Sequence, residues 1–87
     1  MVTFNNKERL KMKVQKETAE KVRNELRSYM VKKGLSIQEV ADRLTEKYGR
    51  PESAQNLSNK LNRGAIKYAE VLEIAEVLDY KIEWVEK

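Results

Sequence analysis

The placement of helix caps, apolar residues and chain breakers over residues 34–78 constrains this chain to a series of short helices. Ser36, followed three residues later by Glu39, forms a capping box that marks a helix start. One face of the segment that follows carries the apolar residues Ile37, Val40, Ala41 and Leu44. Gly49 and the only proline, Pro51, end the periodic pattern. The sequence predicts a helix here that packs inward.

The next segment, from Ser53 to Gly64, has helical spacing but is almost entirely polar. Leu57 and Leu61 lie one turn apart and are its only large apolar residues. Amides, a hydroxyl and cations fill the remaining positions: Gln55, Asn56, Ser58, Asn59, Lys60, Asn62 and Arg63. Exposed helices usually favour Glu, Lys and Ala, which are better helix formers than Asn. Either this is simply an exposed helix or, as the composition favours, it is a helix that hydrogen-bonds to DNA.

Two flanking helices are predicted. The first runs from about Thr18 to Lys32 and buries one stripe, which is Ala19, Val22, Leu26, Tyr29 and Met30. The second runs from about Lys67 to Leu78, and we expect it to bury Tyr68, Val71, Leu72, Ala75 and Leu78, with Glu70, Glu73 and Glu76 as a solvated outer stripe. Beyond these helices Tyr80, Ile82 and Trp84 alternate with charged residues, which predicts a short strand.

The two ends of the chain differ in charge. Residues 1–16 carry five basic residues and one acidic residue, whereas residues 65–87 carry three basic and six acidic ones. Leu10, Met12 and Val14 alternate with lysines as in a strand, although the surrounding residues also suit a helix, and we expect residues 1–16 to be a mobile or edge-paired basic arm. Either the arm lies along DNA phosphates or it is a frayed terminus. The predicted divisions are 1–16 arm, 17–79 helical domain and 80–87 tail.

Composition excludes several classes of chemistry. The 87 residues suffice for one small domain and include no cysteine and no histidine. Disulfides, thiolate chemistry and histidine acid–base catalysis are therefore excluded, and a metal site would have to be built from carboxylates. We expect no enzyme activity, no cofactor and no metal. No apolar run approaches the roughly 20 residues that cross a bilayer, so we expect a cytoplasmic protein without membrane contact.

Taken in this order, the segments resemble the Cro/repressor (lambda-repressor-like, XRE) class of helix-turn-helix domains of phage and bacterial regulators. The resemblance rests on residues 34–44, 54–64 and 71–78. It implies an all-α fold, a four-helix domain to which this chain adds a C-terminal strand, with the third helix (about 53–63) in the DNA major groove. This chain departs from the family in two places. Ile37 stands where a phosphate-binding glutamine is common, and the connection over residues 45–53 is longer than the usual tight turn.

The resemblance also implies a set of contacts with double-stranded DNA. The base contacts would be Gln55, Asn56, Asn59 and Lys60, and the phosphate contacts would be Ser36, Ser53, Arg63 and Lys67. Amides pair with adenine and lysine donates to guanine, so the residue types suit the role. The implied function is that of a sequence-specific transcription regulator, such as a repressor, of phage or mobile-element type.

Two hypotheses concern protein partners. Tyr80, Ile82 and Trp84 would form an edge strand that pairs with a second copy, and the resulting homodimer would present two recognition helices to a palindromic site. The alternative is a tail folded back on its own domain. The second functional hypothesis is a protein-interaction module, such as the antitoxin of a toxin–antitoxin pair, that docks through the acidic C-terminal third.

Overall fold

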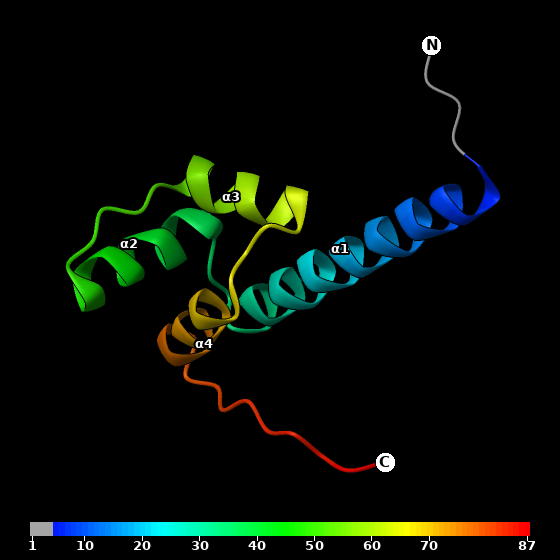
Figure 1. The fold of residues 1–87 in the computed structure, drawn as a ribbon. Helices are drawn as coiled ribbons and strands as arrows, with labels where there is room; N and C mark the ends of the chain where they lie inside the picture. Colours follow the sequence, from blue (N-terminus) through cyan, green and yellow to red (C-terminus); the bar gives the residue numbers. More distant parts are fainter. Residues whose placement is uncertain (1–4) are drawn as a thin grey trace.

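The computed structural model describes residues 5–87, which form four helices: α1 (Asn6–Lys32), α2 (Ile37–Tyr48), α3 (Ala54–Arg63) and α4 (Tyr68–Val77) (Figure 1). The predicted all-α class is confirmed. The three short helices gather around the C-terminal half of α1, and its N-terminal half projects beyond them (Figure 1). The closest helix pairs are α1 with α3, α2 with α3, and α2 with α4.

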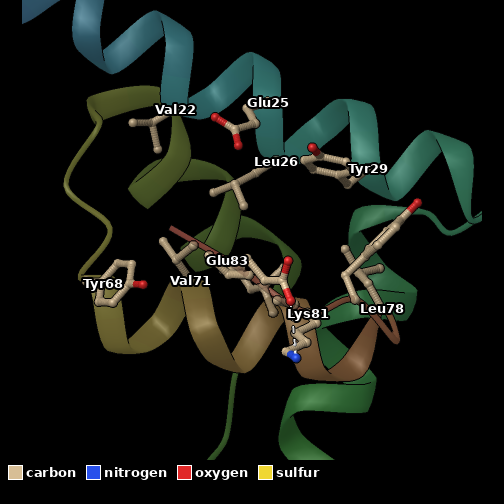
Figure 2. A pocket seen from close by; sticks show the side chains of 13 residues that line it. Val22, Glu25, Leu26, Tyr29, Tyr68, Val71, Leu78, Lys81 and Glu83 are labelled. Carbon is tan, nitrogen blue, oxygen red and sulfur yellow. Dashed lines mark ion pairs between the residues drawn. The ribbon is translucent and has the colours of Figure 1, made fainter. Parts of the chain in front are cut away.

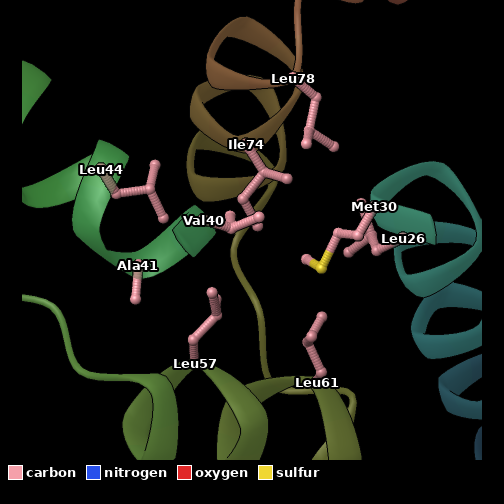
Figure 3. Packing of buried hydrophobic residues seen from close by; sticks show 9 residues of the cluster. All are labelled: Leu26, Met30, Val40, Ala41, Leu44, Leu57, Leu61, Ile74 and Leu78. Carbon is pink, nitrogen blue, oxygen red and sulfur yellow. The ribbon is translucent and has the colours of Figure 1, made fainter. Parts of the chain in front are cut away.

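Apolar side chains from all four helices form the core (Figure 3). They are Leu26, Met30, Val40, Ala41, Leu44, Leu57, Leu61, Ile74 and Leu78. The predicted core faces of the first three helices are confirmed. For α4 the prediction was right for Leu78, which is 2% exposed, and wrong for Tyr68 and Leu72, which stay 51% and 44% exposed, while Ile74, which was not predicted, is buried. This helix is apolar on two sides, so the periodicity of its apolar residues does not identify which side packs against the core.

Helix α1 begins at Asn6, well before the predicted start. The Asn5 side chain accepts a hydrogen bond from the backbone N–H of Glu8 at 2.8 Å and caps the helix. Residues 6–16 are therefore helical and continuous with α1, and the prediction of a strand-like or separate arm was wrong for them. Lys, Glu, Arg, Leu and Met are good helix formers, and this segment contains no glycine or proline. Residues 1–4 of the predicted arm lie outside the described residues.

The predicted C-terminal strand is not found in residues 80–87. Asp79 adopts a left-handed conformation (φ 61°), and the N–H of Tyr80 donates to the Ala75 carbonyl at 2.8 Å, which closes α4. The turn carries Tyr80 back to α1, where its ring centroid lies 4.9 Å from that of Tyr29. The Lys33 ammonium lies 4.5 Å from the same ring. Tyr80 thus packs on its own domain and leaves no paired edge for a strand.

The C-terminal end of α3 meets α1 at one very close approach. Gly64 ends the helix at φ 63°, and the N–H of Ala65 donates to the Lys60 carbonyl at 2.9 Å. A Cβ atom added to Gly64 would lie 2.4 Å from the Cβ and 2.9 Å from the Cα of Ala19. Only glycine fits this contact. The contact fixes where α3 ends against α1.

The contact predicts that Gly64→Ala destabilises the fold more than the same change at Gly49. Both glycines have nearly the same positive φ, so left-handed strain of about 1–2 kcal/mol is common to the two variants. Open space surrounds Gly49, whereas the new methyl at Gly64 would overlap Ala19 and add about 1–3 kcal/mol. Urea unfolding followed by far-ultraviolet circular dichroism measures both. Equal losses in the two variants would show that the approach is not tight.

Candidate nucleic-acid interface

Two polar residues of α3 hydrogen-bond to α1. The guanidinium of Arg27 on α1 donates from Nη2 to Ser58 Oγ at 3.3 Å and to Asn62 Oδ1 at 3.2 Å. Leu57 and Leu61 face the core and are 1% and 0% exposed. One flank of the helix is therefore bound to α1, and the apolar face is fully covered.

Lys60 occupies the flank of α3 that faces α4. Its Nζ lies 2.6 Å from a carboxylate oxygen of Glu70 and 3.1 Å from one of Glu52. The hydrogen bond with Glu70 is the main cause that raises the pKa of Lys60 above 10.5, and it also lowers the pKa of Glu70 below 4.5. Lys60 was predicted as a base contact. The structure instead holds it against two carboxylates, apart from the other predicted base contacts.

The remaining polar residues form what we call the outer face of α3: Gln55, Asn56, Asn59 and Arg63. All four are exposed and recur at helical spacings of three and four residues. The Arg63 Nε donates to the backbone carbonyl of Asn59 at 3.4 Å, which draws the guanidinium along this face. Three amides and one guanidinium thus share a surface, and the helix contains no acidic residue. The structure brings together three predicted base contacts and one predicted phosphate contact.

The two serines predicted as phosphate contacts are helix caps. Ser36 Oγ accepts from the N–H of Glu39 at 3.1 Å, and Ser53 Oγ accepts from the N–H of Asn56 at 3.0 Å. Each hydroxyl hydrogen remains a donor for another group. Ser53 directly precedes the outer face. The fourth predicted phosphate contact, Lys67, is exposed at the start of α4.

The long connection between α2 and α3 is anchored at its C-terminal end by one hydroxyl. Thr45 Oγ1 accepts from the N–H of Glu52 at 2.9 Å and lies 3.2 Å from the carbonyl oxygen of the same residue. Two residues before Glu52, Arg50 forms an ion pair with Glu73 of α4. The connection spans residues 49–53, and its end is fixed one residue before the cap of α3.

The glutamates of the acidic stripe of α4 form ion pairs with α2, with the connection and with α3. Glu76 pairs with Lys47 at 3.1 Å, Glu73 pairs with Arg50, and Glu70 pairs with Lys60. Our prediction of a solvated stripe was therefore wrong. The spacing of the three glutamates was visible in the sequence, but their partners lie in other elements. The ion pairs orient α4 and neutralise three cations that were counted as surface charge.

The ion pairs predict a pH-dependent effect of Lys60→Met. At pH 7 this variant loses the pairs with Glu52 and Glu70 and leaves the carboxylates facing each other, so we expect a loss of about 1 kcal/mol or more. The pKa of Glu70 is lowered in the folded state, so its contribution to stability is lost as pH falls from 4.5 through the folded value. The difference from the parent protein should shrink near about pH 3.

Urea unfolding at the two pH values measures this effect. Arg63→Met is the matched control, because Arg63 lies on the same helix but outside the ion pairs, and it should change stability little at either pH. A loss from Lys60→Met that does not depend on pH would mean that packing of its aliphatic chain matters and that its charge does not.

Two features are not found in residues 5–87. There is no group of three acidic side chains here that is placed to hold a metal ion. None of the described helices has the length and apolarity needed to cross a membrane.

The comparison with protein families places most of this bundle in one family. The model of a family described as Domain of unknown function (DUF6471) matches residues 19–82. No curated protein and no solved structure is found to match the chain. The matched residues begin at Ala19, where Gly64 packs, and include α2, α3 and α4 but not the projecting half of α1. The chain belongs to the DUF6471 family.

Proposed function

We propose that this protein is a sequence-specific DNA-binding regulator that inserts α3 into the major groove. The observation that carries the proposal is the outer face of α3, where three amides and a guanidinium are exposed together on a helix without acidic residues. A duplex major groove is wide enough to admit one α-helix. The core and the ion pairs hold α3 from its other sides, so its outer face is free to meet a ligand.

The side-chain types on the outer face match the groups that a DNA duplex presents. Gln55, Asn56 and Asn59 each offer a donor and an acceptor, as bidentate pairing with adenine requires. Arg63, at the end of the helix, is suited to a backbone phosphate, together with Ser53 and Lys67. Lys60 is omitted from the proposed base contacts because two carboxylates hold it.

A basic flank of α1 supports the same orientation. Arg27 reaches α3 from this flank, and a helix returns to nearly the same side every seven residues. Arg23 lies four residues before Arg27, and Lys16 and Arg9 precede Arg23 at seven-residue steps. These cations continue along the side of α1 that borders α3. They would add sequence-independent attraction to phosphates.

The first test is binding of the full chain to random-sequence duplex DNA by fluorescence anisotropy, over about 50 to 300 mM salt, followed by selection from a sequence pool. We expect an affinity that falls steeply with salt and an enriched site. Binding that enriches nothing would contradict sequence recognition. No binding at the lowest salt would contradict the proposal and favour a protein-interaction module.

Two substitutions separate base contacts from phosphate contacts. Asn59→Ala should weaken binding to the selected site by about 1–3 kcal/mol and relax preference at one base pair. Arg63→Ala should weaken binding to all sequences and reduce the salt slope by about one. Lys32→Ala, exposed near the C-terminal end of α1, is the matched control for Arg63→Ala. Uniform losses from both outer-face variants would show that the base-contact assignment is wrong.

A further inference from the structure

An open apolar groove of about 490 Å³ lies between α1, α4 and the C-terminal tail (Figure 2). Val22, Glu25 and Tyr29 line it from α1, and Val71, Ala75 and Ile82 line it from the other two segments. The groove exists because α4 packs chiefly on α2, so its side toward α1 is only partly covered. Glu25 and Arg27 point to different sides of α1, so the groove is separate from the contact with α3.

Within residues 5–87, no other helix packs on the projecting half of α1. Every residue from Asn6 to Thr18 is exposed, including Leu10, Met12 and Val14 at 62%, 52% and 52%. An isolated helix of about a dozen residues is marginally stable in water, so such a segment gains much from packing. It is continuous with the rest of α1 and extends away from the groove (Figure 1). It therefore cannot fold back into the groove of its own chain.

The projecting half and the groove share one stripe of α1. Its residues follow one another at spacings of four or three: Lys7, Lys11, Val14, Thr18, Val22, Glu25 and Tyr29. If two copies of α1 lie antiparallel with Thr18 at the centre, Lys11 of one copy comes opposite Glu25 of the other. The same register places Val14 opposite Val22 and Leu10 opposite Leu26. Apolar residues thus meet the groove, and a lysine meets its acidic edge.

We propose that the groove is the docking site for the projecting half of α1 from a second copy of this chain. The association is reciprocal, so two identical contacts close a two-fold symmetric dimer. Charge supports this occupant. The projecting half carries five basic residues and two acidic ones, whereas Glu25 stands at the groove beside an ion pair between Lys81 and Glu83. The proposal does not depend on DNA binding.

The test is the mass of the full chain without DNA, measured by sedimentation from about 1 to 200 µM, a range that detects micromolar association. We expect a dimer. Leu10→Glu and Val14→Glu each place a carboxylate in the apolar contact and should raise the dimer Kd at least about tenfold. Met12→Glu is the matched control, because Met12 is equally exposed on the same segment but points to another side of α1. It should leave the dimer intact.

A charge exchange tests the register. Lys11→Glu and Glu25→Lys should each weaken the homodimer, because each creates two like-charge pairs. In an equimolar mixture of the two variants, both pairs become attractive again, so a heterodimer should form with nearly the parent affinity. A general loss of structure cannot produce this recovery. Circular dichroism of each variant should remain that of the parent, since both side chains are exposed.

Two results would overturn the proposal. The first is a parent protein that stays monomeric to about 200 µM. The second is a dimer that Leu10→Glu, Val14→Glu and the charge exchange leave unchanged, because the contact must then lie elsewhere. DNA is absent from the mass measurement, so failure here leaves the proposed function untouched.

Discussion

The position of α3 depends on the burial of two leucines. Leu57 and Leu61 contribute almost all of the apolar surface of this helix, and burying each of them stabilises the fold by about 1.5–3 kcal/mol. Its asparagines and serine are poor helix formers, so α3 would not persist without that contact. Tertiary packing thus allows a helix whose exposed surface is selected for hydrogen bonding and not for helix propensity. The glycine contact with Ala19 then sets the position of its end.

The cations of this bundle fall into two groups with different roles. Lys47, Arg50 and Lys60 are paired with the glutamates of α4, which holds the connection between α2 and α3 in place. Arg63 and the basic flank of α1 are outside these ion pairs, and all of them except the half-buried Arg23 are exposed. Formal charge counted along the sequence does not distinguish these groups. The proposed ligand would meet the second group only.

Local sequence signals predicted those features of the fold that residues within one helix determine. The capping box at Ser36, the end at Gly49 and the two leucines of α3 depend on neighbours within one helix, and all were predicted. The errors have two causes. The partners of Lys60 depend on residues in other elements. The start of α1 and the packed face of α4 each depend on two sequence patterns of similar strength. The amides and Arg63 of the proposed site were predictable from composition. The exclusion of Lys60 from the base contacts required the three-dimensional structure.

The only tryptophan of this protein is on the tail, and its side chain is 88% exposed. Its ring centroid lies 6.4 Å from that of Tyr68, which lines the groove. Tryptophan fluorescence therefore reports on the local environment of the tail and of one groove wall. Because Trp84 is so exposed, we expect its emission in the folded chain to resemble that of indole in water. A shift of the tryptophan emission spectrum on association would report a change at this wall. Unfolding of the buried core would change the tryptophan emission little.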